Sequence, residues 1–169
     1  MCADRERDRP KADDAQAALT QFATVLDAAH LSTSRALVQH ARMTRHAADY
    51  VEVLPRLQRI QAGIERIYRR SAEDQFGELT PLLLKAVPPS LSWHEQAIQL
   101  TILMYATQEL LQQARAAADK LPEDAPGCDS AKRGLRKLFL QANRLCAELD
   151  ELEQEAVYQQ EEDDAVAAQ

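Results

Sequence analysis

Apolar residues in the last third of the chain recur at alternating spacings of three and four positions. They are Leu135, Leu138, Ala142, Leu145, Leu149, Leu152 and Ala156. This spacing places all of them along one stripe of a continuous α-helix, at the positions that face a neighbouring helix in a coiled coil or bundle. The pattern predicts a helix over about residues 130–160 whose stripe is covered by another helix, either of this chain or of a partner.

Three further segments carry the same spacing. The first helix should begin near Ala12 or Asp13, with a stripe of Leu19, Phe22, Leu26 and Ala29. The second stripe consists of Leu57, Ile60, Ile64 and Ile67, and its helix should fade between residues 75 and 79. The third helix should run from residue 91 or 92 to 120, with a stripe of Trp93, Ala97, Leu100, Met104, Leu111, Ala114, Ala118 and Leu121.

These stripes predict an all-α protein with three to four long amphipathic helices that form a helical bundle or a coiled-coil hairpin. The composition agrees, because the chain has only four glycines and 5% aromatic residues, which suits long helices better than a sheet. The predicted organisation is a disordered N-terminus over residues 1–11, a helical bundle over residues 12–160, and an acidic disordered tail over residues 161–169.

Two positions leave the course of the helices open. Residues 30–34 either break the first helix, with a Ser or Thr capping the next one, or lie within a continuous helix. Continuity is favoured because the apolar phase runs on through Ala36, His40 and Met43 to Tyr50. At Pro55 a helix either kinks or a new one begins, since proline in a helix interior costs about 3 kcal/mol.

Two connecting segments are predicted. Residues 80–90 contain three prolines, and the apolar residues 82–84 within them are expected to pack across one end of the bundle. Residues 121–130 contain two prolines and a glycine and should form the turn before the last helix, with Asp129 or Ser130 as its N-cap.

The net charge of −7 is unevenly distributed. Residues 35–70 contain eight arginines and only three acids, whereas residues 148–164 contain nine acids and no Lys or Arg. The overall acidity argues against nucleic acid as a partner, because a nucleic-acid interface needs a net basic face. A basic surface and an acidic surface are expected to coexist on one bundle.

The cysteines and the apolar content indicate the cellular compartment in which the protein is expected. Cys2, Cys128 and Cys146 form no CxxC pair, which suits a reducing compartment, and Cys146 is expected in or beside the core. The charged first residues lack the apolar region of a secretory signal, and no apolar run reaches the roughly 20 residues of a membrane span. The expectation is a cytoplasmic protein with at most peripheral contact to a membrane.

No constellation of residues indicates catalysis. The four histidines lack the spacing of metal ligands, and His40 and His46 are expected to face partly outward. The serines lack a nucleophile elbow, and the isolated glycines form no phosphate-binding loop. We therefore expect no enzyme activity, no cofactor and no metal. Trp93 is expected to anchor the core at one end of the bundle.

Two surfaces are candidates for partner binding. The first consists of the stripe residues Leu135, Leu138, Leu145, Leu149 and Leu152 together with Leu57, Ile60, Ile64 and Ile67. The second is an arginine face that consists of Arg56, Arg59, Arg66, Arg69 and Arg70. This face is either a plain solvated helix surface, with the C-terminal acids available to pair with it, or a docking surface for an acidic partner or anionic lipid.

The segment over residues 26–68 resembles the KxDL family of small helical proteins. The similar residues start with the Leu-Ser-x-x-Arg sequence at residues 31–35 and continue through His46, Val51, Glu52, Leu57, Ile60 and Ile64. Members of that family belong to the BLOC- and BORC-type complexes that build lysosome-related organelles and position lysosomes. The resemblance implies a scaffold subunit without catalytic residues, at the cytosolic face of lysosomes or other organelles.

Two hypotheses of function follow. In the first, the protein is a non-enzymatic scaffold or adaptor subunit of a multiprotein helical complex, in lysosome or vesicle trafficking, and its stripes bind other helical subunits in a hetero-oligomer. In the second, it is a self-contained helical bundle that binds an acidic partner or an anionic membrane through the arginine face. The stripes would then be buried within the isolated chain.

Overall fold

The structure is a computed structural model that describes residues 3–43, 48–83 and 91–169. Its elements are α1 (Ala3–Arg42), α2 (Ala48–Val51), α3 (Val53–Ser71), α4 (Glu73–Phe76), α5 (Trp93–Asp119) and α6 (Cys128–Ala167). The described residues contain helices and no strands, so the predicted all-α class is confirmed.

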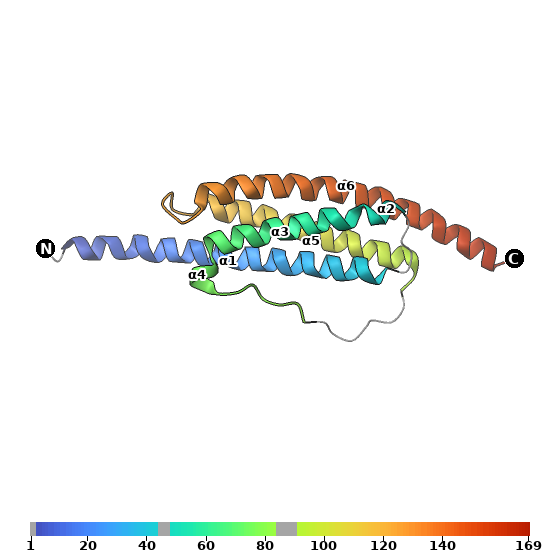
Figure 1. The fold of residues 1–169 in the computed structure, drawn as a ribbon, viewed down its shortest axis with the longest axis horizontal. Helices are drawn as coiled ribbons and strands as arrows, with labels where there is room; N and C mark the ends of the chain where they lie inside the picture. Colours follow the sequence, from blue (N-terminus) through green and yellow to red (C-terminus); the bar gives the residue numbers. More distant parts are fainter. Residues whose placement is uncertain (1–2, 44–47, 84–90) are drawn as a thin grey trace.

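Four long helices form a bundle in which each helix packs against two others. Helix α1 packs against α3 and α5, and α6 packs against the same two helices (Figure 1). In cross-section, α1 and α6 therefore occupy one diagonal, and α3 and α5 the other. The helix pairs that are adjacent in this square are the ones whose apolar stripes must match.

The helices run up, down, down and up along the chain. Helices α1 and α6 point one way and α3 and α5 the other, so the end of α3 and the start of α5 lie at opposite ends of the bundle (Figure 1). The described first part of the connection between α3 and α5 is fastened to α1, because the N–H and the hydroxyl of Thr80 donate to the Asp27 carboxylate at 2.8 and 2.7 Å. Leu83 is 82% exposed, so its expected packing across the bundle end is wrong, and Leu84 lies outside the described residues.

The apolar stripes meet in one core, as predicted. All residues of the first, second and third predicted stripes are buried, and so are those of the last stripe except Leu152, which is partly buried against the core. The predicted bundle is therefore closed by the chain's own four long helices.

Helix α1 passes through residues 30–34 without a break, as the continuing apolar phase favoured. The hydroxyls of Thr33 and Ser34 donate to the carbonyl oxygen of His30, so they bond within the helix and do not cap a new one. The helix ends at Arg42, short of Tyr50. It begins at Ala3, so the predicted start near residue 12 was too late, and its first part projects beyond the bundle (Figure 1).

At Pro55 a new helix begins instead of a kink. Helix α3 starts at Val53, which places Pro55 in its first turn. The backbone N–H groups of a first turn have no partner within the helix, so proline removes no hydrogen bond there. Helix α3 ends at Ser71, and the short helix α4 follows up to Gly77.

The boundaries of the last two long helices are set by different caps. Helix α5 starts at a capping box in which Ser92 and Glu95 bond each other's backbone N–H, as the predicted start at residue 91 or 92 allows. Helix α6 is capped by Gly127 at φ 70°, and not by Asp129 or Ser130. It ends at Ala167, beyond the predicted residue 160, and this end also projects from the bundle (Figure 1).

The burial of α6 yields a stability prediction. Leu145 is fully buried and Leu140, on the same helix, is 51% exposed. Leu145→Ala should lower the free energy of unfolding by about 2–5 kcal/mol, because it leaves a cavity in the core. Leu140→Ala should change it by less than about 0.5 kcal/mol. Urea titrations followed by circular dichroism measure both values, and equal losses would contradict the placement of the stripe in the core.

Candidate functional site

The stripe residues named as a partner surface lie inside the chain's own bundle. Leu57, Ile60 and Ile64 on α3 are at most 1% exposed. On α6, Leu135, Leu145 and Leu149 are fully buried, Leu138 is 5% exposed and Leu152 is partly buried. Ile67 is 8% exposed. These residues contact the facing helices of the same chain, and a partner helix could reach them only if the bundle opened.

A cleft of about 350 Å³ lies between α3 and α6, on the outside of the bundle. Its apolar floor is formed by Ile67 and Leu138, and Gly63 and Gly134 contribute bare backbone to its walls. The polar residues Ser71, Ser130 and Gln141 line it as well. The volume is at the lower end of the roughly 300–1,000 Å³ range of small-molecule pockets.

The two glycines allow α3 and α6 to approach closely. A Cβ atom at Gly63 would lie 2.5 Å from a terminal methyl of Leu138, and one at Gly134 would lie 3.0 Å from a terminal methyl of Ile67. The apolar side chains of each helix thus fill the space that the glycine of the other leaves free. This contact brings the cationic side chains that flank both stripes to the rim of one cleft.

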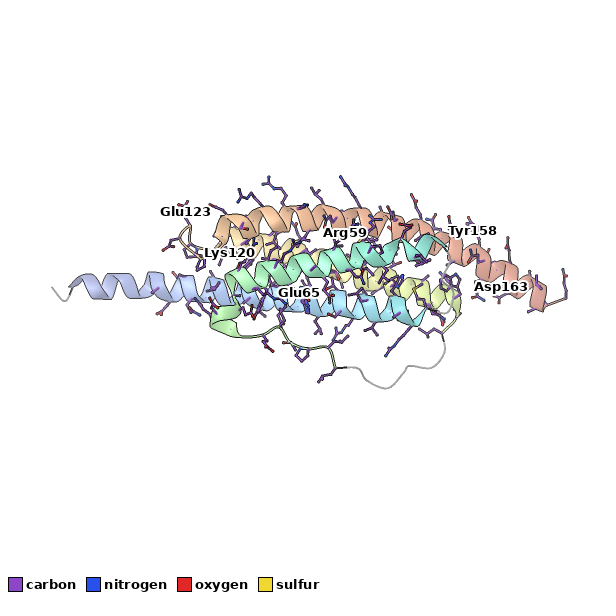
Figure 2. The ribbon with its side chains drawn as sticks, viewed as in Figure 1. Arg59, Glu65, Lys120, Glu123, Tyr158 and Asp163 are labelled. Atoms are coloured by element: carbon purple, nitrogen blue, oxygen red, sulfur yellow. The ribbon has the colours of Figure 1, made fainter. Side chains whose placement is uncertain are left out.

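The charge of the cleft is one-sided. Its lining includes Arg59, Arg66 and Arg70 from α3 and Lys137 from α6, and no described residue in the lining is acidic. Figure 2 shows Arg59 on α3 where this helix runs beside α6. The density of arginines in the sequence pointed to the three arginines but not to Lys137, although Lys137 precedes the stripe residue Leu138 and therefore flanks the facing stripe.

A second hollow of about 190 Å³ continues the cleft along the same two helices. Arg59 and Gln141 line both hollows, and Arg56 and Arg144 line the second one. We call the two together the basic groove. Arg69 is exposed but lines neither hollow, so the structure separates it from the other four arginines of the predicted face.

The C-terminal acids neutralise only one end of the basic groove. Arg56 forms an ion pair with Glu148. Farther along, α6 carries its acids away from the bundle, and Asp163 lies at the opposite end of the molecule from the loop that holds Lys120 and Glu123 (Figure 2). Among the described residues, Arg59, Arg66 and Arg70 form no ion pair.

A second polar cluster lies at the end of the bundle where α5 begins, and its contacts stabilise the fold. The Trp93 ring meets the Tyr50 ring edge to face at 5.3 Å, and its N–H donates to Gln159 at 3.1 Å, which supports the expected role of Trp93 as an anchor. His40 is only 6% exposed, with its Nε2 at 2.7 Å from the Tyr50 carbonyl oxygen. Its expected outward position is wrong, and His46 lies outside the described residues.

The described residues were also compared with the requirements of a reactive thiol, a metal site and a membrane span. Cys146 is buried, as expected, and this burial, with a smaller effect of Asp150, raises the pKa of its thiol to about 12. Among the described residues, no three His, Cys, Asp or Glu side chains are grouped so that they could hold a metal ion. None of the described helices is both long enough and apolar enough to cross a membrane.

No family model matches the chain, and neither a curated protein nor a solved structure matches it. The resemblance of residues 26–68 to the KxDL family is not tested by these comparisons and stays a prediction.

The buried tyrosine and thiol predict a loss of stability at high pH. Burial raises the pKa of Tyr50 to about 12, with smaller effects of Glu153 and Glu155, whereas the unfolded chain ionises near 10 at tyrosine and near 9 at cysteine. Above pH 9 deprotonation therefore favours the unfolded chain, by up to about 1.4 kcal/mol per pH unit for each group. The free energy of unfolding should be unaffected by these groups below pH 9 and should fall between pH 9 and 12.

The variant Tyr50→Phe isolates the contribution of the tyrosine. It should lose stability less steeply than the wild type between pH 10 and 12, because phenylalanine does not ionise. Tyr158→Phe is the matched control, since Tyr158 is 67% exposed, and should keep the wild-type slope. Urea titrations at pH 8, 10 and 11 measure the slopes, and identical slopes for all three proteins would contradict the prediction.

Proposed function

We propose that this protein is a non-enzymatic, self-contained helical bundle that acts as an adaptor by binding an acidic segment of a protein partner in the basic groove. The observation that carries the proposal is the lining of the cleft, where three arginines and a lysine face one hollow and no described acidic residue lines it. The remaining features of the groove argue for the same class of partner.

The electrostatics of the groove favour an anionic ligand. Like charges that share a partly enclosed space repel each other, and the low-dielectric wall of Ile67 and Leu138 strengthens their field. A carboxylate placed between them removes this repulsion. The planar guanidinium of arginine also binds carboxylates through two parallel hydrogen bonds, which suits three arginines that have no ion-pair partner among the described residues.

The shape of the groove favours an extended protein segment over a membrane surface. Two hollows with a shared wall follow the line between α3 and α6, which provides space for successive side chains of a bound segment. A membrane-binding face usually adds apolar side chains that insert below the headgroups. None of the exposed large apolar residues among those described lines either hollow.

Burial of the stripes favours this function over binding through coiled-coil seams. A partner helix that used Leu145 or Leu149 would have to displace α3 or α5 from the core, at the cost of the contacts that close the bundle. The basic groove is accessible without such opening. A role in lysosome or vesicle trafficking rests on the resemblance to the KxDL family alone.

The double variant Arg59→Glu/Arg66→Glu tests the proposal. The probe is a fluorescein-labelled decapeptide of glutamate and glycine, and its binding is followed by fluorescence anisotropy. We expect the variant to weaken binding by about tenfold or more, the equivalent of about 1.4 kcal/mol, because it replaces two attractive charges with repulsive ones. Binding by the wild type should also weaken as salt is added.

The control is Arg69→Glu/Arg136→Glu, which changes the net charge by the same amount at exposed positions of α3 and α6 that line neither hollow. It should bind the peptide within about twofold of the wild type. Equal weakening in the two variants would indicate nonspecific attraction and would contradict a groove. Binding of the wild type to phosphatidylserine vesicles but not to the peptide would favour a membrane as the partner.

A further inference from the structure

We propose that the end of the basic groove beside the first turn of α6 is a subsite for a phosphoryl group, so that the acidic segment bound there carries a phosphorylated serine or threonine. This inference rests on the proposed function, since it specifies the chemistry of the same partner. It is carried by hydrogen-bond donors that lack a partner among the described residues, at the end of α3 and in the first turn of α6.

The end of α3 and the start of α6 are in direct contact. Ser71 is the last residue of α3, and Gly127 is the N-cap of α6. A Cβ atom at Gly127 would lie 3.5 Å from the hydroxyl of Ser71 and 3.6 Å from the carbonyl oxygen of Arg70. Ser71, Gly127 and Ser130 all line the cleft.

The first turn of α6 leaves two backbone donors without a partner. The N–H of Cys128 donates to Ala125 and that of Ala131 to Gly127, but no hydrogen bond within the described residues satisfies the N–H groups of Asp129 and Ser130. A serine or aspartate at the N-cap would accept from one of them, but Gly127 has no side chain to do so. Such free N–H groups at a positive helix end attract anions.

Ser71 supplies a second, independent donor. Ser71 is only 7% exposed, and its buried hydroxyl forms no hydrogen bond among the described residues. An unsatisfied buried hydroxyl costs about 1–3 kcal/mol. A ligand oxygen in the cleft would accept this hydrogen bond and remove the cost.

The surrounding charges favour a dianion at this position. Arg66, Arg70 and Lys137 line the same cleft, whereas Asp129, the acidic residue in the first turn of α6, is exposed and does not line it. A phosphoryl group carries about 1.5 to 2 negative charges and three acceptor oxygens, which is more than a single carboxylate offers to this set of donors. The groove continues past Arg59, with space for the acidic residues that flank the phosphorylated side chain.

The test compares two fluorescein-labelled peptides, the glutamate–glycine decapeptide with one central serine and the same peptide with phosphoserine. Fluorescence anisotropy with the full chain gives both affinities. The phosphopeptide should bind about tenfold or more tightly, because one to three charge-assisted hydrogen bonds are added. Ser71→Ala and Arg70→Gln should each reduce this ratio to about threefold or less, whereas the control Arg69→Gln should keep it.

The possible outcomes distinguish the phosphoryl subsite from the proposed function and from other phosphate ligands. Equal binding of the two peptides by the wild type overturns the phosphoryl subsite and leaves the proposed function standing, whereas binding of neither peptide overturns both. Inorganic phosphate or vesicles with a phosphoinositide that bind more tightly than the phosphopeptide would overturn a phosphorylated protein segment as the ligand. Thermal melts verify the fold of each variant, and Ser71→Ala should melt no lower than the wild type, since the lost hydroxyl has no partner.

Discussion

The close contact between α3 and α6 closes the four-helix bundle and forms the basic groove. It depends on Gly63 and Gly134, because a Cβ atom at Gly63 would force a terminal methyl of Leu138 to move, and one at Gly134 would crowd a terminal methyl of Ile67. Glycine within a helix destabilises the fold by about 0.5–1 kcal/mol relative to alanine at each position, because it loses more conformational entropy on folding. Here the two glycines allow Ile67 and Leu138 to pack closely, and they bring the flanking cations of both helices together.

The sequence predicted the fold well wherever the apolar spacing was regular. The stripes on α1, α3, α5 and α6 are buried as their three- and four-residue spacing indicates, because burial of such a stripe stabilises the helix that carries it. Helix ends were predicted less well. Residues 3–11 and 161–167 are helical but have no stripe to bury, and Gly127 caps α6 although nearby serine and aspartate are the commoner caps.

The candidate site could be predicted only in part. The arginines were recognised from their density on one segment, but a sequence alone does not pair α3 with α6, and so it did not bring in Lys137, Ser71 or Gly127. It also grouped Arg69 with its neighbours, although the helical turn between Arg66 and Arg70 places Arg69 outside the cleft. Whether a stripe faces its own chain or a partner depends on the same pairing, which the up-down-down-up topology determines.

The parallel course of α1 and α6 has a mechanical consequence. Because these two helices run the same way and project from opposite ends, the chain enters the bundle at one end and leaves it at the other (Figure 1). The 27 residues of α5 alone span about 40 Å. The molecule therefore acts as a spacer that keeps anything joined to its two ends apart by at least that length. The basic groove lies along its side, between the two ends.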